Sequence, residues 1–248
     1  MEYKYETLKK IIVPDDVELY FIGDLHGDYD AFKSIIKNAG VREKDFIITT
    51  GDVVDRGKKI TPLLFDFVFK ENYHMPIGNH EQFMLNHIYR DFFVNWVDGD
   101  GKETVEQLGL EGIKFFCGKI VEKFPLMLEV HHRGKIFGVV HAAIPMLYKQ
   151  NCICKWQDIV KKAEVDSKYR EELIWDRDVI DTIQTGLIEM PFIEGVDYVI
   201  HGHTGVRKPV LYKNMLWIDT KFVSGSFTLH NFNNESNEWN YVDERMDD

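Results

Sequence analysis

The most constraining feature of this sequence is a unit that occurs three times in its first ninety residues: a short apolar run, a turn rich in glycine and polar residues, and a helix with one apolar face. The apolar runs at 17–22, 46–50 and 73–77 are predicted strands, and the apolar residues after each turn have helical spacing. Because each helix returns the chain in the same direction, the three strands are predicted to pair in parallel. The chain is therefore predicted to begin as an α/β structure.

The rest of the chain is predicted to be richer in strands. Residues 91–125 are predicted to form a helical cover that contains a polar loop at Asp98–Gly101. A hairpin is predicted at 126–140, and further strands are predicted at 198–200, 216–219, 226–232 and 239–242. We expect these later strands to be antiparallel. The predicted fold class is α/β (mixed α+β), with a two-sheet β-sandwich core flanked by helices.

Composition excludes several classes of protein. The chain has no linker-like stretch and no repeat of fixed period, so we expect one domain over residues 1–248. No run approaches the roughly 20 apolar residues of a membrane span, and residues 1–10 lack the apolar segment of a secretion signal. A formal net charge of −11 disfavours binding to nucleic acid, and the three cysteines fit a reduced, cytoplasmic protein. The oligomeric state cannot be read from the sequence.

Five predicted strands end in residues that commonly bind metal ions. The first three turns read GDLHG at 23–27, GDVVDRG at 51–57 and GNHE at 78–81, and two later strands lead into His141 and His203. Side chains at the carboxyl ends of parallel strands meet at one edge of a sheet, so we expect the turns to converge. The six candidate ligands are Asp24, His26, Asp52, Asn79, His141 and His203.

This ligand set favours two divalent metal ions. Carboxylates, imidazoles and an amide oxygen suit Mn²⁺, which we expect first, or Fe or Zn²⁺, and they do not require the cysteines. Six protein ligands are too many for a single catalytic ion that keeps an open position. Two ions that share a carboxylate and a water lower the pKa of that water, which then yields hydroxide near neutral pH. The ligand set therefore predicts a hydrolytic centre.

The five blocks, in order from Gly23 to Thr204, resemble the motifs of the calcineurin-like metallophosphoesterases. Within that superfamily the chain is most similar to the PPP-type Ser/Thr protein phosphatases, especially the bacteriophage lambda type. The LIWDR stretch at 173–177 resembles the lambda-type segment that contributes a second phosphate-binding arginine. The resemblance implies the fold of that family and in-line attack on phosphorus by a hydroxide that bridges two metal ions.

The resemblance also implies a role for each residue. It assigns Asp24, His26 and His203 to one metal ion, Asn79 and His141 to the other, and Asp52 to both as the bridge. It makes His80 the general acid, with Asp55 as its orienting carboxylate, and it gives phosphate binding to Arg56 and Arg177. A carboxylate partner stabilises a protonated imidazole, and a guanidinium binds phosphate through parallel hydrogen bonds.

Several neighbouring residues lie outside this assignment of roles. Ile77, Asp176 and Lys221 stand where the family commonly has arginine, asparagine and glycine. Lys221 either brings a cation toward the substrate groove or faces water. Glu81 is expected only to brace its turn, whereas His201 is expected either to pack or to take part in the site. The tryptophans at 96, 156 and 175 are expected to be core or cover.

The leading hypothesis is a metal-dependent phosphomonoesterase, a protein serine/threonine phosphatase that acts on phosphorylated protein or small phosphoesters. The same framework resembles symmetrical diadenosine tetraphosphate hydrolases, which are the alternative enzymes. A non-catalytic metal-binding scaffold is the alternative of another class, because a fold alone does not establish activity. The presence of every predicted ligand, the acid and both arginines favours an enzyme.

Overall fold

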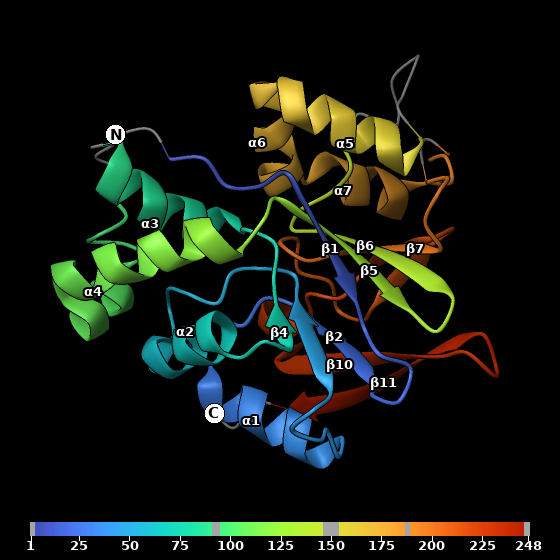
Figure 1. Cartoon of the computed structure of the whole chain (residues 1–248), viewed down its shortest axis with the longest axis horizontal. Helices are drawn as coiled ribbons and strands as arrows, with labels where there is room; N and C mark the ends of the chain where they lie inside the picture. The colour runs from blue at the N-terminus through green and yellow to red at the C-terminus, as the bar shows by residue number, and fades with distance from the viewer. Residues whose placement is uncertain (1–2, 91–94, 146–153, 187–188, 246–248) are drawn as a thin grey trace.

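Figure 1 shows the chain as a computed structural model that describes residues 3–90, 95–145, 154–186 and 189–245. Two β-sheets lie at the centre, and helices surround them. The helices are α1 (Tyr29–Asn38), α2 (Ile60–Phe69), α3 (Asn79–Tyr89), α4 (Lys102–Lys123), α5 (Trp156–Val165), α6 (Ser167–Trp175), α7 (Asp178–Thr185) and α8 (Lys221–Ser224). Within the described ranges, no helix is long and apolar enough to cross a membrane. The first residues of the predicted helical cover, 91–94, lie outside these ranges.

A five-stranded sheet contains the three strands predicted at the start of the chain. Its order is β11 (Glu238–Arg245), β10 (Ser226–Asn233), β2 (Leu19–Ile22), β3 (Phe46–Thr49) and β4 (Tyr73–His74). β2 pairs with β3, and β3 with β4, in parallel, as predicted. β10 joins β2 antiparallel and forms a hairpin with β11. The carboxyl ends of β2, β3 and β4 therefore lie at one edge of the sheet.

A six-stranded sheet differs in part from the sequence prediction. Its order is β1 (Leu8–Ile12), β5 (Met127–His132), β6 (Lys135–Val140), β7 (Tyr198–His201), β9 (Met215–Trp217) and β8 (Val210–Tyr212). β5 and β6 form the predicted antiparallel hairpin, but β6 pairs with β7, and β7 with β9, in parallel. The chain passes through α5, α6 and α7 between β6 and β7, and such a crossover returns a strand in the same direction. The carboxyl ends of β6 and β7 therefore lie side by side.

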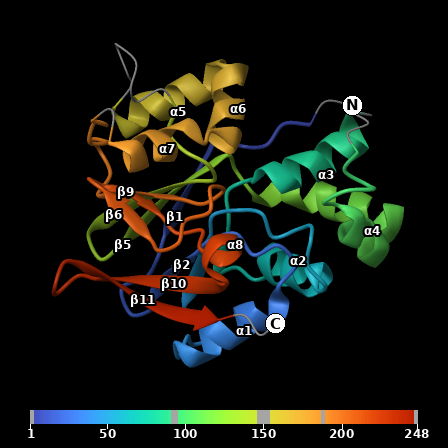
Figure 2. The ribbon, with the colours of Figure 1, turned by 180° about the vertical axis from the view of Figure 1, so that it is seen from behind.

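The two sheets pack face to face and enclose an apolar core. Phe21 on β2 and Phe137 on β6 are both buried, and their ring centroids lie 5.3 Å apart across the sandwich. Helices α5, α6 and α7 lie on the side of the six-stranded sheet, and α1 and α2 lie on the side of the five-stranded sheet (Figure 2). The predicted fold class, a two-sheet core flanked by helices, is confirmed.

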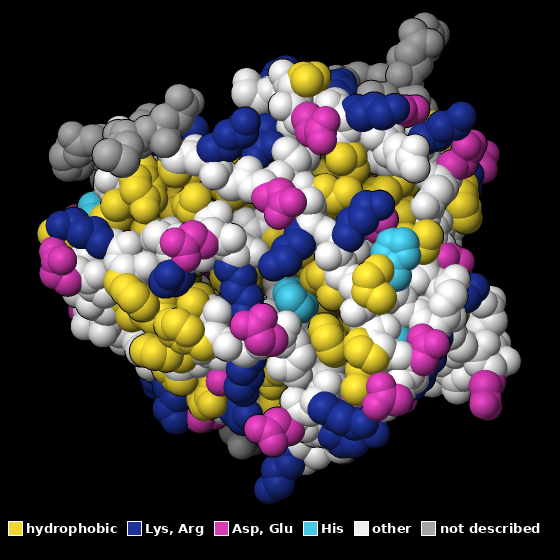
Figure 3. Space-filling model, viewed as in Figure 1, with side chains coloured by type: hydrophobic (Ala, Val, Ile, Leu, Met, Phe, Trp, Pro, Cys, Tyr) yellow, Lys and Arg dark blue, Asp and Glu magenta, His cyan; other side chains and the backbone are white. Residues whose placement is uncertain are grey.

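On the face shown in Figure 3, basic and acidic side chains are interspersed.

Candidate metal centre

The polar turns that follow β2, β3, β4, β6 and β7 meet at one edge of the sandwich. The amides of Leu25 and His26 donate to the carbonyl of Asp52 at 3.1 and 2.8 Å, and the amide of His80 donates to Asp52 Oδ1 at 3.0 Å. The amide of Gly202 donates to the carbonyl of His141 at 2.8 Å. The structure therefore brings together turns that lie almost 180 residues apart in the sequence.

Asp52 lies at the middle of this cluster and is buried. Its Oδ2 atom is 3.6 Å from His26 Nε2, 3.5 Å from His141 Nε2 and 3.9 Å from His80 Nε2. Burial raises the pKa of Asp52 well above its usual value, and the positive charge of His80 partly opposes that rise. A buried carboxylate is costly without a cation, so this position favours metal binding.

Two groups of potential ligands share Asp52. His26, Asp52 and His80 form one group and Asp52, His141 and His203 form the other, with ligand atoms in each group within 4.8 Å of one another. These donors fit divalent metal ions because they combine a carboxylate with imidazole nitrogens. Nε2 of His203 is buried and has no hydrogen-bond partner among the described residues, and burial lowers the pKa of His203 to about 2. An unprotonated, unpartnered imidazole nitrogen is a suitable ligand atom.

The structure places His203 differently from the grouping expected by resemblance. His203 Nδ1 lies 2.9 Å from Asn79 Oδ1, and His141 Nε2 lies 2.9 Å from the same oxygen. The ring therefore lies beside Asn79 and His141, whereas its backbone amide donates to Asp24 Oδ2 at 3.0 Å. The parallel pairing of β6 and β7 explains this, because it brings the residues after both strands to the same place.

Asp24 is fixed between two other turns. Its Oδ1 accepts a hydrogen bond from Thr50 Oγ1 at 2.7 Å, and a Cβ atom at Gly202 would clash with that same oxygen. Asp219, which follows β9, is buried nearby; burial raises its pKa well above the usual value, and the charge of Asp24 raises it further. Asp219 was not among the predicted site residues, although it is the last residue of a predicted strand.

His80 and Asp55 form the predicted pair. His80 Nδ1 lies 2.7 Å from Asp55 Oδ2, and burial, which alone would lower the pKa of His80, is outweighed by Asp52 and Asp55, so that the pKa is raised. Trp96 Nε1 donates to Asp55 Oδ2 at 2.7 Å, and Thr104 Oγ1 donates to Oδ1 at 2.5 Å. Trp96 was expected only to be core or cover, and Thr104 was given no part in the site, because no local pattern indicates their contacts with Asp55.

The two predicted phosphate-binding arginines lie on different sides of the cluster. Arg56 Nη2 lies 3.0 Å from His80 Nε2 and 3.2 Å from Asp100 Oδ2, so the Asp98–Gly101 loop holds the guanidinium beside His80. Arg177 is exposed, and its Nη1 donates to the carbonyl of His203 at 3.1 Å. Both arginines border the cluster and leave donors available for an anion.

Glu81 and His201 act as structural supports beside the cluster. The Glu81 carboxylate accepts the amides of Asp52 and Val53 at 2.9 Å and that of Gly78 at 3.0 Å, so it braces two turns. The ring of His201 stacks on Trp217 with centroids 4.7 Å apart, and burial lowers the pKa of His201 to about 3. The packing alternative for His201 thus fits its surroundings.

The backbone at these turns is unusual. Positive φ angles occur at His26 (43°), Asp52 (51°), Asp55 (69°), Arg56 (63°) and His203 (62°). Residues other than glycine rarely adopt this conformation, which costs roughly 1–3 kcal/mol at each position. Such a concentration of strained residues is typical of functional sites.

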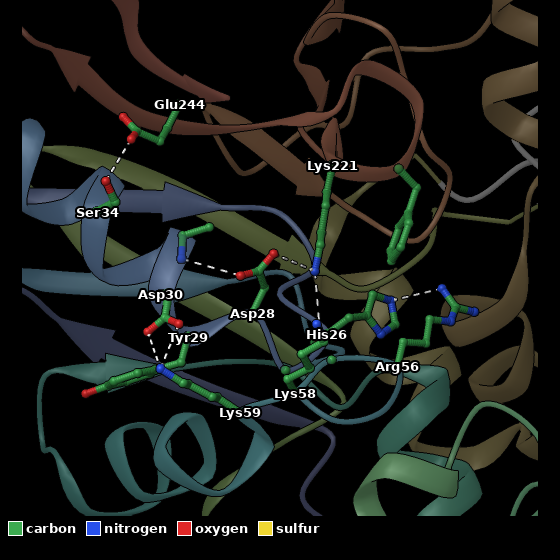
Figure 4. A pocket seen from close by; sticks show the side chains of 14 residues that line it. His26, Asp28, Tyr29, Asp30, Ser34, Arg56, Lys58, Lys59, Lys221 and Glu244 are labelled. Atoms are coloured by element: carbon green, nitrogen blue, oxygen red, sulfur yellow. Dashed lines mark hydrogen bonds and ion pairs between the residues drawn. The ribbon is translucent and has the colours of Figure 1, made fainter. Parts of the chain in front are cut away.

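A cavity of about 820 Å³ opens beside His26 and Arg56. Figure 4 shows that α1, the loop after Arg56 and the turn that carries Lys221 line it. Lys221 is buried, so of its two expected alternatives the one in which it faces water is wrong. Its ammonium group contacts the carbonyl oxygen of Leu25, in the turn that carries His26.

Comparison with known proteins identifies the family of this chain. A family model described as calcineurin-like phosphoesterase matches residues 18–207. Serine/threonine-protein phosphatase 1 of Salmonella typhimurium is 25% identical over 227 residues, which cover 89% of this chain and 94% of the relative. Serine/threonine-protein phosphatase 2 of Escherichia coli is 24% identical over 204 residues, which cover 82% and 86%. A solved structure described as "Crystal structure of a putative diadenosine tetraphosphatase" superposes with a TM-score of 0.62 at 14% identity and covers 97% of this chain and 99% of its own.

Proposed function

Because the chain belongs to the calcineurin-like phosphoesterase family and is a phosphate-ester hydrolase, we propose that it is a protein serine/threonine phosphatase. The observation that carries this proposal is the His80–Asp55 contact of 2.7 Å. Serine and threonine alkoxides are poor leaving groups and need a proton as the ester bond breaks. The phosphate leaving group of a dinucleotide is far less basic, so it gains less from an acid.

The ligand geometry supports a pair of divalent ions. We assign His26 and Asp24 to one position, Asn79, His141 and His203 to the other, and Asp52 to both, with Mn²⁺ as the first choice and Fe or Zn²⁺ as alternatives. When bound, such ions would ionise a water and neutralise negative charge on the phosphate. The protein itself supplies the ligand positions and the strained, buried surroundings that keep them rigid.

The remaining residues handle the proton and the phosphate. Nε2 of His80 donates its proton to the ester oxygen that leaves, and Asp55 stabilises the imidazolium before that transfer. Arg56 and Arg177 bind phosphoryl oxygens from two sides of the cluster. Arg56 Nη2 lies 3.0 Å from His80 Nε2, so we expect the guanidinium to turn toward a bound phosphate and to leave this nitrogen free to carry the proton.

A comparison of substrates tests the proposal. Protein stripped with a chelator and supplied again with Mn²⁺ should hydrolyse phosphoserine and phosphothreonine peptides and p-nitrophenyl phosphate, and Asp52→Asn should lose these activities. Release of two nucleoside diphosphates from diadenosine tetraphosphate in strong preference to phosphopeptide would favour the dinucleotide alternative. If none of these substrates is hydrolysed, the scaffold alternative gains support.

The cavity gives the dinucleotide alternative its own structural support. A volume of about 820 Å³ is within the range of nucleotide-sized ligand sites, and the rings of Tyr29 and Phe222 form part of its wall. The cavity meets the candidate metal centre at His26 and Arg56. The rate comparison above separates the two substrates.

A further inference from the structure

Lys221 has a buried ammonium group that no step of the proposed reaction uses. It is the first residue of α8, and its Nζ atom lies 2.7 Å from the carbonyl oxygen of Leu25, 3.4 Å from that of His26 and 3.5 Å from Asp28 Oδ2 (Figure 4). Its side chain is 7% exposed. A lysine in this setting is held in one position by its partners and by the aromatic rings of Phe222 and Phe227 beside it.

The contacts argue against substrate binding by Lys221. An ammonium group has three protons to donate and no other polar capacity. Two of them face the carbonyls of Leu25 and His26, and the third faces the carboxylate of Asp28. No proton is left for a phosphoryl oxygen. The geometry therefore indicates that Lys221 holds the adjacent backbone turn in place.

The turn that Lys221 contacts needs support on its carbonyl side. The amides of Leu25 and His26 donate to the carbonyl of Asp52, whose turn Glu81 braces in its own right. The amide of Asp28 also reaches the Leu25 carbonyl at 3.2 Å, whereas the His26 carbonyl receives its hydrogen bond from Lys221. His26 Nδ1 also lies 3.1 Å from the Val54 carbonyl oxygen, so Lys221 adds to an existing contact of the ring. Because His26 has a φ angle of 43°, loss of the hydrogen bond to its carbonyl would allow its backbone to relax and shift the imidazole relative to Asp52.

We propose that Lys221 is a positioning residue that holds the Leu25–His26 turn and thereby sets the affinity of the metal position that includes His26. The position formed by Asn79, His141 and His203 does not depend on it, because these ligands lie at the start of α3 and after β6 and β7. The inference rests on the proposed function only in requiring two metal positions.

The positive charge of Lys221 has an effect on metal binding opposite to that of its hydrogen bonds. A cation near a metal position repels a divalent ion, so loss of the charge alone would strengthen binding. The carboxylate of Asp28, 3.5 Å away, offsets that charge. Groups that orient a metal ligand typically contribute 10- to 100-fold in affinity, which exceeds the residual repulsion of a paired ammonium group. Loss of the support therefore predicts weaker metal binding, whereas loss of the charge alone predicts stronger metal binding.

The test is a Mn²⁺ titration of the chelator-stripped, full-length protein by calorimetry, with the bound metal counted by elemental analysis. Lys221→Met keeps the apolar stem and should weaken one of the two binding steps by about 10- to 100-fold and leave the other within twofold. Lys221→Arg should restore part of the loss. In a His26→Ala background, Lys221→Met should have no further effect on the step that remains.

Lys123 offers a matched control. Its ammonium group donates to the carbonyls of Val68 and Lys70 at 3.0 and 2.7 Å, and neither residue is a predicted metal ligand, so Lys123→Met also removes two bonds from an ammonium group to backbone carbonyls. Both steps should stay within twofold of wild type in that variant. The proposal is overturned if Lys221→Met strengthens binding, leaves both steps unchanged or weakens both equally, or if wild type binds fewer than two ions. Two-step binding by a protein that hydrolyses nothing would contradict the proposed function alone.

Discussion

Replacement of Asp55 by asparagine separates the proton-transfer role of His80 from its role in binding. In Asp55→Asn the new amide oxygen could still accept from His80 and Trp96, so the arrangement of side chains should survive while the negative charge disappears. At an effective dielectric constant of about 20, a charge pair about 4 Å apart is worth about 4 kcal/mol, which sets the order of magnitude of the loss. The pKa of His80 should therefore fall, and less of it should be protonated at neutral pH.

The expected consequence depends on the leaving group. With a phosphothreonine peptide, kcat/KM should fall by roughly 10²- to 10⁴-fold, the usual contribution of general acid catalysis. With p-nitrophenyl phosphate, whose leaving group needs little protonation, the fall should be several-fold at most. The loss on the peptide should grow between pH 6 and pH 8, because the variant's His80 loses its proton at lower pH than in wild type.

Steady-state rates on both substrates, measured with saturating Mn²⁺, test whether the loss depends on the leaving group. His80→Asn serves as the companion variant and should show the same dependence on leaving group, and the double variant should lose little more than either single one. Equal losses on the two substrates would refute the acid assignment. So would a double variant whose losses multiply.

Two further predictions concern stability. Glu81→Gln should lower the free energy of unfolding of metal-free protein by about 1–3 kcal/mol in urea titrations, because a side-chain amide cannot accept from all four turn amides at once; an unchanged midpoint would show that the brace is dispensable. Burial lowers the pKa of His230 to about 3, so its neutral form contributes stability that is complete above pH 6.5 and is lost as pH falls from there toward 3. Between pH 7 and pH 5 the free energy of unfolding should fall by roughly 2 kcal/mol less in His230→Gln than in wild type; equal falls would contradict this origin of acid sensitivity.

Local signals explain which parts of the molecule could be predicted. The parallel strands β2, β3 and β4 were predictable because each is an apolar run followed at once by a polar turn and an amphipathic helix. Their residues Asp24, Asp52 and Asn79 could be placed together for the same reason. The family and the two-sheet fold class were also predicted correctly, since five motifs in order carry far more information than any one of them.

Long-range pairing explains the rest. The position of the His203 ring depends on β7 lying parallel to β6, and apolar periodicity does not report strand direction. β1 was missed because its sequence, LKKII, interrupts the apolar pattern with two lysines. The bonds of Trp96 and Thr104 to Asp55 arise from the packing of α4 and the residues before it, and no local pattern marks such contacts.

The left-handed backbone at His26, Asp52 and His203 has a consequence for how such a protein could change over time. Glycine at any of these positions would relieve the conformational cost, and at Asp52 it would also remove a charge that burial disfavours. Selection for thermal stability alone should therefore favour replacement of these residues and yield proteins that are more stable but inactive. Persistence of these three side chains requires a selective pressure other than folding itself.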